Sequence, residues 1–225
     1  MNRRWSGPTI TSRPDTAGTV ELTHWPESHH GPVLTYLAYC GEEFGSCAKL
    51  DKSTLQFFAI DRVGLVDPDR TLSQYATAKG IWGSDLLITN NSSFVVEIPS
   101  TVASGYYVLR HEIIALHFAR APALGPQHYP QCFNLHVTGT GQDVPKGAKG
   151  SDLYGGASDV AGLTYDIYSD DLEPYEVPGP TLYSAASPFA QQTPMNIRST
   201  AAAQTGPEST PATRARRITP RHNQM

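Results

Sequence analysis

Histidines are the side chains of this sequence best suited to chemistry. Of the eight in the chain, five stand out by their surroundings: His29, His30, His111, His117 and His128. Imidazole is a natural ligand for copper, zinc, iron or nickel. His29 lies in a Pro-Glu-Ser-His-His-Gly-Pro loop that leads into an apolar run, so it could be held rigidly at the edge of a strand. Two exposed loop histidines are the alternative interpretation, and this motif alone favours it.

A second histidine pair lies in the apolar segment Arg110–His117. If the segment is extended, His111 and His117 point to one face, while Glu112 points to the other face with Arg110. Histidines on an apolar face are usually hydrogen-bonded core residues, and this alternative stays open, more so for His111 than for His117. A zinc-dependent hydrolase that uses both histidines is a further hypothesis.

A third motif, Gly-Pro-Gln-His-Tyr-Pro-Gln-Cys, places Gln127 and Tyr129 two residues apart. They share a face if the segment is extended, whereas His128 points away. A phenol and a carboxamide that point together could supply an axial ligand and a hydrogen-bond partner beside a metal ion. A packed aromatic ring and a surface amide are the alternative.

The cysteines leave the redox environment open. Cys40 and Cys47 enclose a short loop and could form a local disulfide, which would leave Cys132 without a partner. Three reduced cysteines, as in a cytosolic protein, are the alternative. The number of cysteines does not decide between the two.

Short apolar runs separated by turn residues predict an all-β fold in which antiparallel strands form a sandwich. The predicted strands are Val33–Tyr39, Leu55–Ile60, Leu86–Thr89, Phe94–Ile98, Tyr106–His117 and Phe133–Val137. Leu72–Thr77 is predicted to form a short helix. Long loops around Ala119–Gln127 and Gly139–Gly156 are expected to carry functional surfaces.

Composition divides the chain into three parts. We predict an irregular segment over residues 1–17, one domain over 18–184, and a disordered Ser/Thr/Pro/Ala-rich tail with a basic end over 185–225. A net charge of −4 gives no reason to expect a nucleic-acid partner. No apolar stretch is long enough to span a membrane, and the first residues do not form a secretory signal peptide.

Read in order, these motifs resemble successive signatures of a family of enzymes. Four segments are similar to the fungal, cellulose-active lytic polysaccharide monooxygenases of auxiliary activity family 9, formerly glycoside hydrolase family 61: Ser28–Cys40, Leu109–His117, Gln127–Gly139 and Tyr175–Pro180. The third segment, in which Gln-x-Tyr precedes Pro-Gln-Cys, is specific, and the ordered set is far more specific than any single segment. The resemblance covers roughly residues 18–184.

The resemblance implies a role for each matching residue. His29 would be the side-chain copper ligand, and Tyr129 would lie in the axial position. His117 and Gln127 would surround the metal and hydrogen-bond the oxygen or peroxide co-substrate. Tyr175 would lie on a flat face and stack on cellulose, because the apolar face of a sugar ring suits an aromatic partner.

The family also implies a fold and an activity. The fold would be an immunoglobulin- or fibronectin-III-like β-sandwich with long loops and a disulfide between Cys40 and Cys47. The activity would be copper-dependent oxidative cleavage of cellulose or a related β-1,4-glucan at C1, C4 or both. It would use one copper ion, an external electron donor, and O2 or H2O2. The protein would be a secreted monomer with neither nucleic acid nor membrane as a partner.

The beginning of the chain departs from the family. There, the mature N-terminal histidine binds copper through its amino group and its imidazole, but this chain begins Met-Asn-Arg-Arg-Trp, and the family's first strands and signal peptide are not recognisable. Neither His24 nor His29 carries a free amine. In the family, the cysteine that matches Cys132 pairs with a cysteine in that unmatched region. We therefore expect weak copper binding and no cellulose oxidation from the chain as written, and a non-catalytic carbohydrate-binding β-sandwich is the alternative function.

Overall fold

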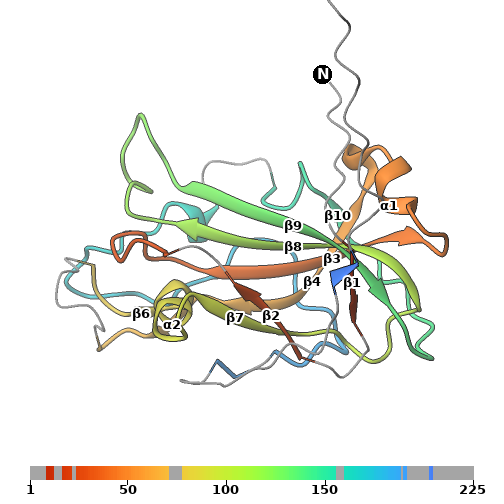
Figure 1. The fold of residues 1–225 in the computed structure, drawn as a ribbon. Coiled ribbons are helices and arrows are strands. Elements are labelled where there is room, and N and C mark those ends of the chain that lie inside the picture. Colours follow the sequence, from red (N-terminus) through yellow and green to blue (C-terminus); the bar gives the residue numbers. More distant parts are fainter. Residues whose placement is uncertain are drawn as a thin grey trace, which may run out of the picture.

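The structure is a computed structural model. It describes residues 24–70, 78–155, 160–188 and 190–191, together with the backbone of three short strands at 9–12, 17–21 and 203–204. Figure 1 shows a molecule built mainly of strands. The described residues also form two short α-helices. Two 3-10 turns, at Lys52–Thr54 and Ala161–Leu163, complete the described helical segments.

The main layer is a seven-stranded sheet with the strand order β10-β4-β3-β8-β9-β1-β11. Its neighbouring strands are antiparallel, except that β1 and β9 are parallel. The strands of this sheet are β1 (Thr9–Ser12), β3 (Val33–Gly41), β4 (Gln56–Val63), β8 (Gly105–Ala115), β9 (Gln127–Val137), β10 (Ala148–Lys149) and β11 (Ala203–Gln204).

Two smaller sheets and two helices accompany this layer. β2 (Ala17–Glu21) pairs with β7 (Ser93–Glu97), and β5 (Leu65–Asp67) pairs with β6 (Ile81–Trp82). The helices are α1 (Ser46–Lys49) and α2 (Gly83–Thr89).

The main sheet buries both of its faces. Along β8, Leu109 and Ile113 enter one hydrophobic cluster, whereas Val108 and Ile114 enter a second cluster on the other face. Phe94 and other residues of β7 pack into the first cluster, so that β2 and β7 form the second layer of a β-sandwich. The predicted all-β, immunoglobulin-like sandwich is confirmed.

The segment Leu86–Thr89 was predicted to be a strand, and that prediction is wrong, because the segment belongs to helix α2. The carboxylate of Asp85 accepts a hydrogen bond from the backbone N–H of Trp82 at 2.8 Å and so caps the start of the helix. Leu87 is fully buried in the first cluster. A short apolar run is compatible with either structure, so its pattern could not decide. The predicted helix Leu72–Thr77 lies outside the described residues.

The domain boundaries remain a prediction, although two strands lie beyond them. β1 falls within the segment 1–17, which was predicted to be irregular, and β11 falls within the predicted disordered tail, 185–225. β1 contains Thr-Ile-Thr, and such β-branched residues favour an extended backbone.

Cys40 and Cys47 form a disulfide, with 5.0 Å between their Cα atoms. It joins the end of β3 to α1. Cys132, on β9, is a free thiol and is half-buried. Among the described residues, no helix has the length and hydrophobicity needed to cross a membrane.

Candidate metal centre

Strand order explains why residues far apart in sequence meet at one end of the main sheet. β3 runs antiparallel to β8, and β8 runs antiparallel to β9. The loop before β3, the loop after β8 and the first residues of β9 must therefore lie together. These three places carry His29, His117 and the pair Gln127 and Tyr129. The loop between β8 and β9 projects beyond the sheet at this end (Figure 1).

The four candidate residues are in contact. The ring centroids of His29 and His117 are 4.1 Å apart, with their planes inclined by 34°. The ring centroid of Tyr129 lies 6.0 Å from that of His29. The hydroxyl of Tyr129 donates a hydrogen bond of 2.6 Å to Oε1 of Gln127. The face shared by Gln127 and Tyr129 follows from the two-residue period of β9.

Trp25, which no motif pointed to, supports this site. Its indole N–H donates a hydrogen bond of 3.0 Å to the backbone oxygen of His29. Its ring packs edge-on against Tyr129, with 5.0 Å between the centroids. In the sequence, the only indication of this role is that Trp25 is an aromatic residue four positions before the candidate ligand His29. On the other side of His29, Oγ of Ser28 lies 3.0 Å from the ring nitrogen Nδ1, so Nε2 is the ring nitrogen left for a metal ion.

The surroundings of the two imidazoles favour the neutral form, which binds metals. Burial lowers the pKa of His29 from its ordinary value, and the neighbouring His30 lowers it further. Burial also lowers the pKa of His117, with smaller contributions from His29 and His30. Neutral imidazole is the ligand form, so protons compete less with a metal here than at an exposed histidine. Nδ1 of His117 is buried and has no hydrogen-bond partner among the described residues.

The adjacent histidines have different surroundings. His29 is half-buried, whereas His30 is only 2% exposed. Nδ1 of His30 lies 2.9 Å from Oδ1 of Asp85, close enough for an ion pair but not aligned for a hydrogen bond. His30 therefore belongs to the contact with helix α2, and the interpretation as two exposed loop histidines does not hold.

His111 lies in the core rather than at this site. It is 1% exposed, and its Nδ1 lies 3.0 Å from Oγ1 of Thr35, in agreement with the core alternative. Within the described ranges, no group of three or more His, Cys, Asp or Glu side chains is arranged to hold a metal ion. The zinc site at His111 and His117 is therefore not formed by these residues.

His128 points to the opposite face of β9, as predicted, and joins a buried charged network. Its Nδ1 lies 2.9 Å from Glu112, whose side chain is fully buried. Glu112 also accepts a hydrogen bond from Nε of Arg110 at 3.0 Å and one from the hydroxyl of Tyr154 at 2.5 Å, and it forms an ion pair of 2.8 Å with the guanidinium of Arg110. Burial would raise the pKa of Glu112, but the hydrogen bond from His128, the charge of Arg110 and the hydrogen bond from Tyr154 hold it below its usual value.

The available donors fit a copper ion as part of a ligand set. Imidazole nitrogen suits copper, and the phenol oxygen of Tyr129 can approach a metal ion from a further direction. His29 is the best placed ligand, because it is half-buried, has a lowered pKa and is fixed from both sides. His117 and Gln127 lie beside it and can orient a bound molecule through hydrogen bonds.

Tyr175, predicted to stack on a sugar, is half-buried. Its ring packs edge-on against Trp82 and Tyr165, and its hydroxyl donates to the backbone oxygen of Gly162 at 2.8 Å. This packing argues against the predicted role, which remains a prediction. Tyr168, which the sequence analysis missed, is 46% exposed, and its hydroxyl lies 3.4 Å from the backbone oxygen of His117.

A family model covers most of the chain. Residues 6–175 match the model described as Auxiliary Activity family 9 (formerly GH61). The chain belongs to auxiliary activity family 9. Among curated members, it is 52% identical over 168 residues to lytic polysaccharide monooxygenase E of Emericella nidulans. It is 48% identical over 178 residues to lytic polysaccharide monooxygenase AA17 of Aspergillus oryzae.

The family 9 chain spans only part of these relatives. The two matches cover 75% and 78% of this chain, but 38% and 66% of the respective relatives. Among solved structures, the extended catalytic domain of LPMO9A from H. jecorina superimposes with a TM-score of 0.72 at 40% identity. That match covers 89% of this chain and 75% of the other. Family membership and fold are therefore established over most of the described residues.

Proposed function

We propose that this chain takes part in copper-dependent oxidative cleavage of cellulose, or a related β-1,4-glucan, at C1, C4 or both. The observation that carries the proposal is the convergence of His29, His117, Gln127 and Tyr129 at one end of the sheet. Membership of family 9 supports the reaction class, since the curated relatives are named lytic polysaccharide monooxygenases.

His29 would hold the copper ion through its free ring nitrogen, and the hydroxyl of Tyr129 would lie close to the ion. Copper, when bound, supplies one-electron chemistry with O2 or H2O2 after reduction by an external donor. Trp25 keeps both residues in place through its contacts with the His29 backbone and the Tyr129 ring. A further nitrogen donor would complete the ligand set, and the family's N-terminal histidine would supply it from outside the described residues.

His117 and Gln127 are proposed to orient the oxidant. Oε1 of Gln127 accepts the hydrogen bond of Tyr129, which leaves the amide N–H groups of Gln127 available as donors. The ring of His117 lies against that of His29, so its edge nitrogens are close to the proposed ligand. A neutral His117 can donate from one nitrogen and accept at the other, and can therefore hold or pass a proton.

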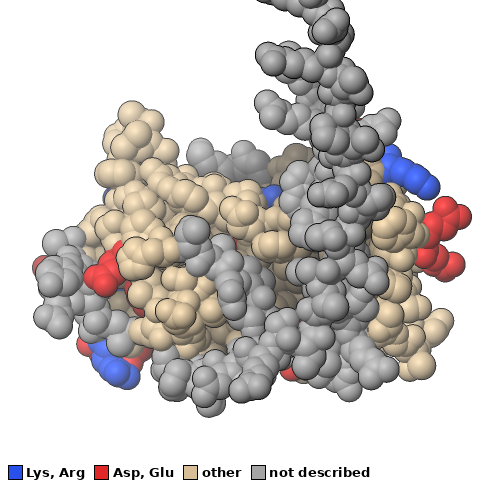
Figure 2. Space-filling model, in the orientation of Figure 1, with Lys and Arg blue, Asp and Glu red and all other residues tan. Residues whose placement is uncertain are grey.

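The exposed aromatic residues beside the site suit an uncharged glucan. Tyr168 is 46% exposed, Phe118 is 41% exposed, and Tyr129 is 36% exposed. The ring of Phe118 packs against His117 with 4.4 Å between the centroids. In Figure 2, the protruding loop between β8 and β9 is mostly neither acidic nor basic. We propose Tyr168 as a sugar contact in addition to Tyr175, the residue that the family resemblance implies.

The proposed context is a secreted fungal monomer that binds insoluble glucan. The sequence relatives come from fungi, and the disulfide between Cys40 and Cys47 suits an oxidising compartment.

Mass spectrometry of soluble products tests the proposal. The copper-loaded protein is incubated with amorphous cellulose and ascorbate. The chain as written, which begins with Met1, should give no oxidised product, whereas the same chain preceded by the family's N-terminal segment, with its histidine first, should release oxidised cello-oligosaccharides. His29→Ala should abolish them without changing the fold. The non-catalytic alternative predicts cellulose binding with no oxidised product, whether or not copper is added. Equal product from the His29→Ala variant would contradict the proposed ligand.

A further inference from the structure

The histidine that follows the proposed copper ligand is buried against an acidic side chain. His30 is 2% exposed, and its Nδ1 lies 2.9 Å from Oδ1 of Asp85, which is also buried. Two such polar groups are costly to bury unless they face each other, so the folded chain must keep them together. Because His30 lies in the loop before β3 and Asp85 in helix α2, their contact fixes this loop relative to the helix.

Helix α2 is itself anchored in the core. Leu87 is fully buried in the first hydrophobic cluster, and the backbone N–H of Gly83 donates to the backbone oxygen of Gly64 at 2.9 Å. The second carboxylate oxygen of Asp85, Oδ2, accepts the hydrogen bond from the backbone N–H of Trp82. The carboxylate that faces the loop is therefore held rigidly.

Two hydrogen bonds join the same loop to α2 at the next residue. Oγ of Ser84 accepts a hydrogen bond from the backbone N–H of Gly31 at 3.1 Å, and the backbone N–H of Ser84 donates to the backbone oxygen of Gly31 at 3.2 Å. Ser84 is fully buried, so water does not compete for these bonds. Ser84 and Asp85 thus hold the two residues that come directly after His29.

The backbone of His30 also contacts the second loop of the metal centre. Its carbonyl oxygen accepts a hydrogen bond of 2.8 Å from the backbone N–H of Leu116. Leu116 directly precedes His117, just as His30 directly follows His29. A displacement of His30 would therefore change the relative positions of the two imidazoles.

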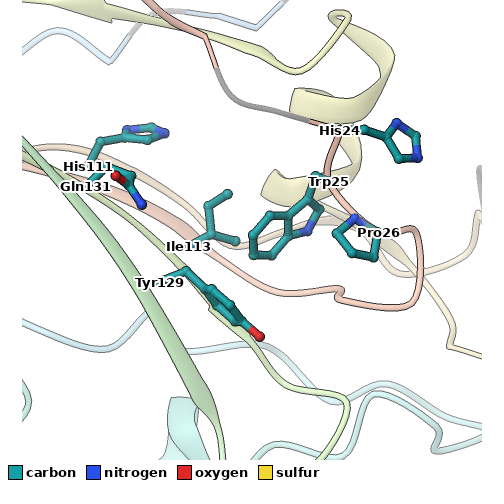
Figure 3. A pocket seen from close by; sticks show the side chains of 7 residues that line it. All are labelled: His24, Trp25, Pro26, His111, Ile113, Tyr129 and Gln131. Carbon is teal, nitrogen blue, oxygen red and sulfur yellow. The ribbon is translucent and has the colours of Figure 1, made fainter.

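Trp25 acts on a different part of the metal centre. Its indole N–H donates to the backbone oxygen of His29 at 3.0 Å, and its ring lies edge-on to that of Tyr129, as Figure 3 shows from close by. Trp25 thus connects His29 with Tyr129, whereas His30 connects His29 with the backbone next to His117.

We propose that His30 and Asp85 are positioning residues of the metal centre, whose buried contact sets the distance and the tilt between the rings of His29 and His117. They would act through the backbone and not by touching copper or substrate. Their effect on copper rests on the proposed function, in which His29 is the ligand. Loss of a group that orients a metal ligand typically weakens metal binding roughly 10- to 100-fold.

NMR of the metal-free chain, with a chelator present, tests the positioning role without copper. We expect a nuclear Overhauser effect between the ring protons of His29 and His117, because their centroids are 4.1 Å apart. His30→Leu should remove this effect. His30→Asn should keep it, because the amide can donate towards Asp85 in place of the imidazole Nδ1. Leu87→Ala is the matched control: it destabilises the same helix through a cavity and should keep the ring contact.

Titration with Cu(II) measures the consequence for metal binding. His30→Leu should weaken it about ten-fold or more, and Leu87→Ala should leave it unchanged. If His30→Leu does not fold, Ser84→Ala, which removes only the side-chain hydrogen bond to Gly31, takes its place with the same expected loss of the ring contact.

A ring contact that persists in His30→Leu, or that is lost equally in Leu87→Ala, would overturn the proposal. The proposed function fails separately, if His29→Ala binds copper as tightly as the unchanged chain. In that case the metal-free NMR measurement still decides whether His30 and Asp85 set the geometry of the two rings.

Discussion

The rings of His29 and His117 lie against each other, with 4.1 Å between their centroids, although they come from the loop before β3 and the loop after β8. Two protonated imidazoles at this distance would repel each other, so each ring favours the neutral form of its neighbour. This agrees with the lowered pKa of His117, to which burial contributes most and His29 next. The contact thus favours the neutral form of His117, whereas burial and His30 lower the pKa of His29.

Copper binding should depend on His29 more than on Tyr129. His29→Ala removes the proposed nitrogen ligand, and we expect at least a 100-fold loss of copper affinity, about 3 kcal/mol. Tyr129→Phe removes only the hydroxyl that would lie close to the ion and should cost about ten-fold or less. Calorimetric titration with Cu(II) measures both. His136→Ala is a matched control, because His136 stacks on Tyr106, away from the metal centre.

The stability of the protein should fall in acid partly because of His111. The pKa of His111 is about 4 in the folded protein, whereas its ordinary value is 6.5. Between these two pH values, His111 is protonated in the unfolded chain but not in the folded protein, so a lower pH favours unfolding. The lowered pKa of His111 therefore makes the free energy of unfolding fall as the pH decreases below 6.5. The fall ends below about pH 4, where His111 is protonated in both states. Between pH 7 and pH 4.5 it amounts to about 2 kcal/mol.

Urea unfolding at these two pH values checks the effect of His111. The His111→Phe variant has no imidazole to protonate at this position. From about pH 7 to about pH 4.5, its free energy of unfolding should therefore fall by about 2 kcal/mol less than that of the unchanged protein. Equal losses in the two proteins would contradict this prediction, because they would mean that the pKa of His111 is the same in the folded and the unfolded state.

The buried network around Glu112 should be important for stability. Glu112→Gln removes the charge that Arg110 and His128 face, and leaves a largely buried guanidinium without its partner. We expect a loss of about 3 kcal/mol in the free energy of unfolding. Tyr154→Phe deletes one hydrogen bond to the same carboxylate and should cost about 1 kcal/mol. Urea denaturation measures both, and the exposed Glu42→Gln should change little.

Cellulose binding should depend on Tyr168. Tyr168→Ala removes an exposed ring beside His117, and we expect a loss of affinity of about five-fold, in keeping with one aromatic contact. Depletion of the protein from solution by insoluble cellulose gives the affinity. Phe44→Ala is the control, because Phe44 is 65% exposed but contacts Tyr106, near the start of β8 and hence at the opposite end of the sheet. An equal loss in both variants would point to non-specific adsorption.

The sequence by itself determined most of the longer strands and the features that depend on local spacing. Alternating residues predicted that Gln127 and Tyr129 share a face while His128 points away, because successive side chains of a strand alternate. The short separation of Cys40 and Cys47 allowed their disulfide. The ordered motifs predicted the family, and with it the candidate residues at His29 and His117.

Only the tertiary structure decided what depends on contacts between distant segments. The antiparallel order β3-β8-β9 brings His29 to His117, and helix α2 provides the Asp85 beside which His30 is buried. Spacing could not separate helix from strand in Leu86–Thr89, nor reveal that Tyr175 packs between other aromatic rings. The local sequence pattern reflects the periodicity of the backbone. Which side chains are buried, and which residues they contact, depends on how distant segments pack together, and this packing is a property of the whole chain.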